Sequence, residues 1–283
     1  MTPFVNAARG TEPRRSSFWR IASALALLAL TAPAVQAQDE TPTNALFPIA
    51  HFDFGAPARI PNNRINALGP EYSNVSNFLG QGLTHGGTAN QGGNLITRMI
   101  MDDITPTGNN AGSDVLEVTF SVANFNATPV SVRARIRFWF DNGGVPGAYY
   151  NLPANVGFTF NPFNFSPGVT LLTGTLAPNL FDMPGSPFWA GITFDNNTGG
   201  TGATLAQMDN MGQGIFDPAD IGFTDDLAFQ TTAAGSFFPT PNPAGTLFSG
   251  APNFVASFGW EFSVDQPVPA DKSSWGRVKK LYR

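Results

Sequence analysis

The chain has 283 residues, of which only 12% are charged and 42% are hydrophobic, a balance that excludes a charged, disordered protein. Its 30 glycines, 24 prolines and 26 phenylalanines indicate many turns between short segments that bury large apolar side chains, within a length that suits one all-β domain. The sequence contains no cysteine, which excludes disulfides, thiolate catalysis and thiolate metal ligands.

The first 37 residues have the pattern of a secretory signal peptide. Arg14, Arg15 and Arg20 supply positive charge, the apolar run 21–34 follows, and small residues suit cleavage after Ala37. The run has 14 residues, fewer than the ~18 to 20 that a membrane-spanning helix needs. We therefore expect an exported chain that has no transmembrane helix in its mature form.

A short polar linker is expected at 38–44, and 45–265 has the uniform texture of one β domain. Brief apolar alternations are separated there by clusters of Gly, Pro, Asn and Asp. The three strongest alternations place on single faces Leu116, Val118, Phe120 and Val122; Val130, Val132, Ala134, Ile136, Phe138 and Phe140; and Phe254, Ala256, Phe258, Trp260, Phe262 and Val264. This two-residue period predicts half-buried antiparallel strands.

The first two of these segments are joined by 124–129, a length that predicts a hairpin. Matching their apolar faces would place Val118 opposite Ile136 and Arg137 across from Glu117. Shorter strand candidates lie at 48–54, 94–101, 155–160, 169–176, 188–194 and 226–232. About nine strands predict an all-β, antiparallel two-sheet sandwich of jelly-roll type, with a barrel as the alternative.

One predicted strand carries a polar face that is a candidate for ligand binding. Guanidinium groups can hold an anion by bidentate contacts, and a Trp ring can support a sugar. The alternative is a solvated face that is paired with neighbouring acids such as Glu117. The residues of this face are Arg133, Arg135, Arg137 and Trp139.

Carboxylates gather in the loop 216–226, and calcium is the cofactor that such a loop suits, since it takes six to eight oxygen ligands. The spacing differs from the D-x-D-x-D loop that ends in Glu, so plain Asx turns are the alternative. No other cofactor is expected. The candidate metal ligands are Asp217, Asp220, Asp225 and Asp226.

Catalytic signatures are weak in this sequence. The chain has only two histidines, His51 and His85, and no G-x-S-x-G motif that would supply a serine nucleophile. A sandwich glycosidase would use two carboxylates, for which Glu117 and Glu261 on the polar faces of predicted strands are the candidates. We expect no enzyme, and keep a glycoside hydrolase as the least favoured alternative.

Charge is divided unequally between the body and the C-terminal segment. Residues 38–270 carry 18 Asp or Glu against six Arg, a net charge of −12, whereas 271–283 has a net charge of +4 and holds all three lysines, Lys272, Lys279 and Lys280. The acidic body would repel phosphates, so nucleic acid is not expected as a partner.

The basic tail also repeats apolar residues at three- to four-residue spacing, which predicts a short amphipathic helix. So short a helix is marginal alone and is expected to dock. Its own domain, a sorting or anchoring receptor and an anionic membrane surface are the alternatives, and the receptor is favoured because a spacer with two prolines separates tail from domain.

The layout of signal peptide, Gly-, Asn- and Phe-rich β domain, spacer and tail (266–283) resembles that of bacterial exported surface proteins with an interchangeable C-terminal sorting tail, the PEP-CTERM and choice-of-anchor class. The tail lacks the Pro-Glu-Pro motif and the hydrophobic helix of the PEP-type signal. The resemblance implies an extracellular or cell-surface location and sorting machinery as a partner. The tail residues that carry it are Trp275, Gly276, Lys279, Leu281, Tyr282 and Arg283.

These observations predict a non-catalytic, exported bacterial protein of the cell surface or extracellular matrix, with a structural or adhesive role. The alternative is a secreted module that binds calcium or a carbohydrate such as a surface polysaccharide.

Overall fold

A computed structural model describes residues 49–54, 66–91, 93–149, 158–196, 202–231, 242–250 and 255–267. The predicted signal peptide and linker lie outside these residues, and so does the tail beyond Pro267. The predictions about those segments therefore stay predictions. The described part of the chain is nearly all β, with antiparallel sheets, as the sequence predicts.

The first sheet has seven strands. Its main path is β1 (Ile49–Phe54), β12 (Gly168–Thr175), β7 (Val115–Asn124), β14 (Met211–Phe216) and β3 (Phe78–Thr84). β17 (Trp260–Pro267) also pairs with β7 and carries β2 (Asn66–Ser73) on its other side. The β1–β12 pair is parallel, which departs from the antiparallel expectation.

The second sheet has ten strands. Its main path is β10 (Phe158–Thr159), β8 (Val130–Asp141), β13 (Phe188–Asp195), β6 (Ile100–Ile104), β15 (Ala228–Thr231) and β16 (Gly245–Phe248). The additional strands are β9 (Pro146–Tyr149) and β11 (Phe163–Phe165), which pair with β8, and β5 (Asn94–Ile96), which pairs with β13 and with β4 (Ala89–Gln91).

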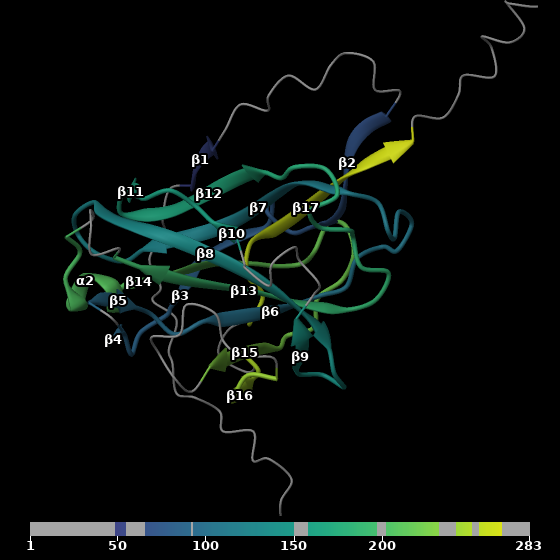
Figure 1. The fold of residues 1–283 in the computed structure, drawn as a ribbon. Coiled ribbons are helices and arrows are strands. Elements are labelled where there is room, and N and C mark those ends of the chain that lie inside the picture. The colour runs from purple at the N-terminus through teal and green to yellow at the C-terminus, as the bar shows by residue number, and fades with distance from the viewer. Residues whose placement is uncertain are drawn as a thin grey trace, which may run out of the picture. The chain divides into compact units, whose positions relative to one another are not determined.

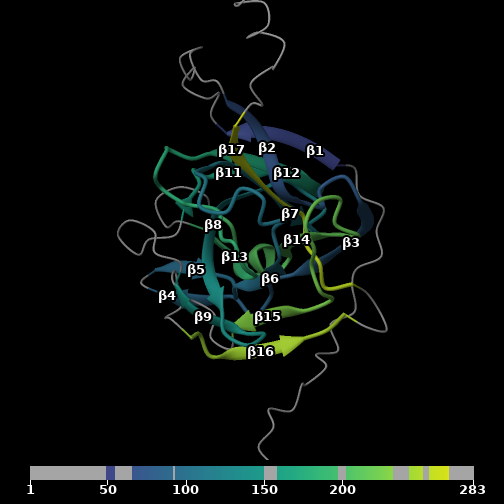
Figure 2. The ribbon, with the colours of Figure 1, turned by 90° about the vertical axis from the view of Figure 1, so that its right-hand side faces the viewer.

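Figures 1 and 2 show the arrangement of the strands of the two sheets. Buried apolar side chains from both sheets form one shared core. Aromatic rings from β17 meet rings from β8 and β13: the ring centroids of Phe262 and Phe138 lie 5.5 Å apart, and those of Phe262 and Phe188 lie 5.3 Å apart, both edge to face. Trp260 stacks beside Phe262 at 5.8 Å. Such pairs add to the stabilisation from apolar burial, so these rings hold the sheets together in a sandwich-like arrangement.

The three strong alternations predicted from the sequence supply this core. Every predicted inward residue of β8 is buried except Phe140, which is 38% exposed. On β7, Val118, Phe120 and Val122 join the core as predicted. Val115 replaces Leu116 there, because the pairing with β17 shifts register between Val115 and Glu117. A bulge of this kind reverses the faces of the residues beyond it.

The predicted hairpin between β7 and β8 is wrong. β7 pairs with β12, β14 and β17, whereas β8 pairs with β13 and lies in the other sheet. The loop 125–129 therefore crosses between sheets. Val118 and Ile136 meet in the shared core rather than on neighbouring strands, and Arg137 lies opposite Gly191 instead of Glu117.

The outer face of the second sheet carries a separate apolar cluster of Met99, Met101, Trp139, Trp189 and Phe229. The sheet is therefore buried on both faces in this region. Gly191 makes room for the cluster, since a Cβ at this position would lie 2.9 Å from both the Met101 Cγ and the Trp139 ring. A side chain there would displace a neighbouring group.

The only helix in the described ranges is α2 (Leu205–Asp209), which begins after Thr204. The Thr204 hydroxyl accepts a hydrogen bond from the Gln207 amide, and the Gln207 side chain accepts one from the Thr204 amide, so the helix has a capping box. With five residues, α2 lacks the length to cross a membrane, and no described helix has it.

Candidate functional site

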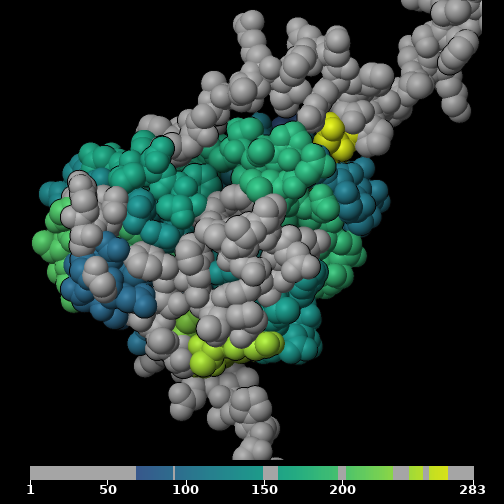
Figure 3. All heavy atoms as spheres, viewed as in Figure 1, coloured from purple at the N-terminus to yellow at the C-terminus, as the bar shows by residue number. Residues whose placement is uncertain are grey.

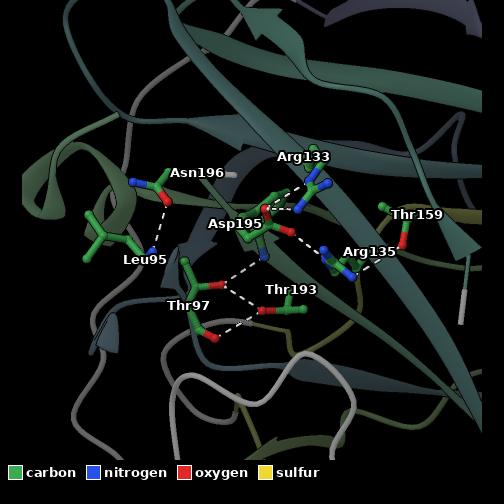
Figure 4. Close-up of polar contacts among 9 residues, drawn as sticks. Leu95, Thr97, Arg133, Arg135, Thr159, Thr193, Asp195 and Asn196 are labelled. Carbon is green, nitrogen blue, oxygen red and sulfur yellow. Dashed lines mark hydrogen bonds and ion pairs between the residues drawn. The ribbon is translucent and has the colours of Figure 1, made fainter. Parts of the chain in front are cut away.

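Two arginines and one buried aspartate form an ion-paired group on the outer face of β8 and β13 (Figure 4). Arg133 Nε donates to Asp195 Oδ1 at 2.9 Å, and Arg133 Nη2 lies 2.8 Å from the same oxygen. Arg135 Nε donates to the other oxygen, Oδ2. The Asp195 side chain is fully buried, whereas the arginine side chains remain 19% and 11% exposed.

The strand register explains this arrangement. Asp195 on β13 lies directly opposite Arg133 on β8, and Thr193 lies opposite Arg135. The two arginines are two residues apart and point to the same face, so one carboxylate reaches both. Arg135 Nη1 also donates to Thr159 Oγ1 at 3.4 Å, which ties β10 to the group.

The chain around Asp195 is held by a threonine pair. Thr97 Oγ1 accepts a hydrogen bond from the Phe194 amide at 3.0 Å, and Thr193 Oγ1 donates to the Thr97 carbonyl at 3.0 Å (Figure 4). Next to Asp195, Asn196 Oδ1 accepts from the Leu95 amide at 2.8 Å. These bonds fix the end of β13 and hence the position of the carboxylate.

The other half of the predicted ligand face is covered. Arg137 is 2% exposed, and Trp139 is fully buried in the outer cluster. The apolar cluster that includes Phe229 packs over the Trp139 end of the predicted ligand face. Ligand binding by Arg133, Arg135, Arg137 and Trp139 stays a prediction.

The four predicted calcium ligands contact different parts of the structure. Asp220 accepts hydrogen bonds from the side chains of Ser76 and Asn77. Asp226 accepts hydrogen bonds from Ser249 Oγ at 3.2 Å and from the backbone amides of Gly250 and Ala256. In the part of the chain that the structure describes, no three acidic or histidine side chains are grouped as a metal site. Calcium binding by Asp217, Asp220, Asp225 and Asp226 stays a prediction.

Two adjacent acids on β6 have strongly perturbed protonation. Asp102 is fully buried between the sheets, where burial and the nearby Asp103 raise its pKa well above the usual value, although the Phe258 amide donates to it at 2.8 Å. Burial raises the pKa of Asp103 to about 7, against hydrogen bonds from the Asp225 amide at 2.7 Å and Thr224 Oγ1 at 3.1 Å. Their side chains point to opposite faces of the sheet, so they do not form a catalytic pair.

His85 is another buried titratable group, at the end of β3. Burial lowers its pKa to about 3, so the imidazole is neutral at physiological pH. Its ring packs on Phe194 at 5.2 Å, and Gln213 lies beside it. His51 lies on β1 opposite Leu171.

The structure brings Glu117 and Glu261 onto neighbouring strands. Glu261 lies opposite Thr119 and Ser263 lies opposite Glu117, so the two glutamates are diagonal neighbours. Ser73 Oγ donates to Glu261 Oε2 at 2.7 Å. A glycoside hydrolase that uses these two carboxylates stays a prediction.

The sequence reading missed Asn74, a fully buried residue that joins three segments. Its Nδ2 donates to the Phe258 carbonyl at 2.8 Å and lies 3.2 Å from the Phe216 carbonyl, and its Oδ1 accepts from the Trp260 amide at 2.8 Å. A sequence motif gives no sign of this role, because its partners lie more than 140 residues away.

Comparison of the sequence with protein-family models, and of the chain with curated proteins and solved structures, found no match. The functional argument therefore depends on the residues themselves.

Proposed function

We propose that this chain is a non-catalytic, exported bacterial protein with a jelly-roll-like β-sandwich and a structural or adhesive role at the cell surface or in the extracellular matrix. The observation that carries the proposal is that the charged groups of the candidate site form ion pairs with one another. Arg133 and Arg135 share the buried carboxylate of Asp195, so their charges contribute to a fixed scaffold.

Three other carboxylates, two in loops and one on β2, support the same reading. Asp220 and Asp226 each bind donors from other loops, and Glu71, which is 1% exposed, accepts from Thr107 and Asn110. Side-chain acceptors used in this way tie loops to the sheets and make the surface rigid. A rigid module suits a protein that carries load or presents a surface.

The signal peptide and tail complete the proposal, with sorting or anchoring machinery as the tail's partner. Expression of the full chain in a bacterial host, followed by fractionation and N-terminal sequencing, tests export and cleavage after Ala37. A variant that ends at Pro267 keeps β17 intact and tests retention at the surface. A truncation at Asp265 would remove two residues of that strand.

Three results would refute parts of this proposal. An uncleaved chain in the cytoplasm would refute export, and unchanged surface retention of the variant ending at Pro267 would refute a sorting role for the tail. Release of free sugars from a polysaccharide by the purified chain would refute the non-catalytic reading. A melting shift with calcium, reversed by chelator, would favour the calcium-binding alternative.

A further inference from the structure

A cavity of about 400 Å³ opens between the β8–β9 turn and the segment that leads into β16. Its apolar lining comes from Val145, Pro146, Phe229 and Pro243. Figure 3 shows the yellow-green atoms of β16 on the surface of the molecule, beside teal atoms of the β8–β9 region. A volume of this size falls within the range of small-molecule sites.

The walls of the cavity are fixed by hydrogen bonds. The Asp141 carboxylate accepts from Trp189 Nε1 at 2.9 Å and from the amides of Gly143 and Gly144, which holds the turn in place. The backbone amide of Asn242 donates a hydrogen bond to the Gly147 carbonyl at 2.7 Å and thereby joins the two walls of the cavity. The cavity is therefore formed before a ligand arrives, which lowers the entropic cost of binding.

Two side-chain amides line the cavity, those of Asn142 and Asn242. Both residues are exposed. Each amide offers donors and an acceptor, so the pair suits groups that both donate and accept, such as hydroxyls. Asn242 also has a φ of 51°, a left-handed conformation in which a non-glycine residue is uncommon.

Charge narrows the class of ligand. None of the lining residues that the structure describes is ionisable, and Asp141 next to the cavity is already hydrogen-bonded to Trp189. The surrounding body carries a net charge of −12 in residues 38–270, which disfavours acidic glycans. The ligand that fits has an apolar face, several hydroxyls and no charge.

We propose that this cavity binds a neutral pyranose unit of a polysaccharide, with the apolar sugar face against Val145, Pro146 and Pro243, above the Phe229 ring, which is 5% exposed, and with the hydroxyls on Asn142 and Asn242. The inference rests on the proposed adhesive role and names the ligand class for it. With two amides and one largely buried ring, the affinity for a single sugar unit is expected near a dissociation constant of about 1 mM.

The test measures binding of neutral methyl hexosides to the full chain by saturation-transfer-difference NMR. The decisive variant is Asn242→Gly, because glycine accepts the positive φ and removes only the amide. We expect it to weaken binding about tenfold. The matched control is Asn179→Gly, since Asn179 also has a positive φ, 59°, but lies in the turn after β12. The affinity of this variant for the sugar should equal that of the unmodified chain.

A second variant, Asn142→Ala, should weaken binding by a similar factor. The inference is overturned if no neutral hexoside binds, if Asn242→Gly binds as tightly as Asn179→Gly, or if uronates bind more tightly than neutral sugars. If Asn242→Gly abolishes sugar binding and leaves surface adhesion intact, the role of this cavity in adhesion is overturned and the proposed function stands. Hydrolysis of an oligosaccharide would instead overturn the proposed non-catalytic function.

Discussion

The ion-paired group of Arg133, Asp195 and Arg135 makes a quantitative prediction about stability. Replacing Asp195 with alanine removes a fully buried carboxylate and leaves two guanidinium groups that face each other across the vacated position. Loss of one partner from a buried ion pair costs about 3–5 kcal/mol. Because the arginine side chains keep 19% and 11% exposure, water stabilises them in part, and we expect a loss of about 2–3 kcal/mol for Asp195→Ala.

Urea unfolding of the purified chain, followed by tryptophan fluorescence, measures this loss as a midpoint shift of about 1 M. Arg133→Met should cost only about 1 kcal/mol, since Asp195 keeps its contact with Arg135. The double variant should lose less than the sum of the single variants, because the repulsion between the unpaired arginines is then removed.

The matched control is Asp182→Ala, which removes an exposed carboxylate and should change the free energy of unfolding by at most about 0.5 kcal/mol. If Asp195→Ala is as stable as this control, the arginines are not part of a structural scaffold. They would then be free to serve a ligand, and the reasoning for the proposed function would fail.

Three other predictions concern buried polar groups. Asn74→Ala should lower the free energy of unfolding by about 3–4 kcal/mol in urea, because it leaves the buried Trp260 amide without its acceptor and the Phe258 carbonyl without its donor. A loss below about 1 kcal/mol would contradict that role. Because the pKa of Asp102 is raised in the folded chain, its contribution to stability is present below the unfolded pKa and is lost as pH rises. Asp102→Asn should therefore reduce the slope of unfolding free energy against pH between pH 4 and 7 by up to about 1.4 kcal/mol per pH unit. An unchanged slope refutes this. The pKa of His85 is lowered, so its effect on stability has the opposite dependence on pH: the contribution is present above pH 6.5 and is lost as pH falls toward 3. If the free energy of unfolding of His85→Gln falls equally steeply in this acid range, this prediction is contradicted.

The alternation of apolar residues predicted well which side chains form the core, but it did not predict which strands pair when they are distant in sequence. The inward faces of β8 and β17 follow from a period of two, which any half-buried strand displays. The same period leaves the partner strand undetermined, since two apolar faces can meet across a core as readily as they can match within one sheet. That ambiguity explains the wrong hairpin between β7 and β8.

The candidate site shows the same division. The sequence identified the arginine row but named Glu117 as the neighbouring acid, whereas Asp195 supplies the carboxylate. The signal that could have found it is the end of the alternation in 188–195, where an acid takes an outward position. The burial of Trp139 depends on Phe229 and Met101, which are far away in sequence and carry no local mark of this contact.

The position of β17 affects the order in which the fold can be completed. This strand is the last described along the chain, yet it lies inside the first sheet, between β7 and β2. Until residues 260–267 are available, both neighbours expose unpaired strand edges, and the rings of Trp260 and Phe262 are missing from the core. A growing chain therefore cannot complete the first sheet or its core until almost the whole of the described β domain has been made.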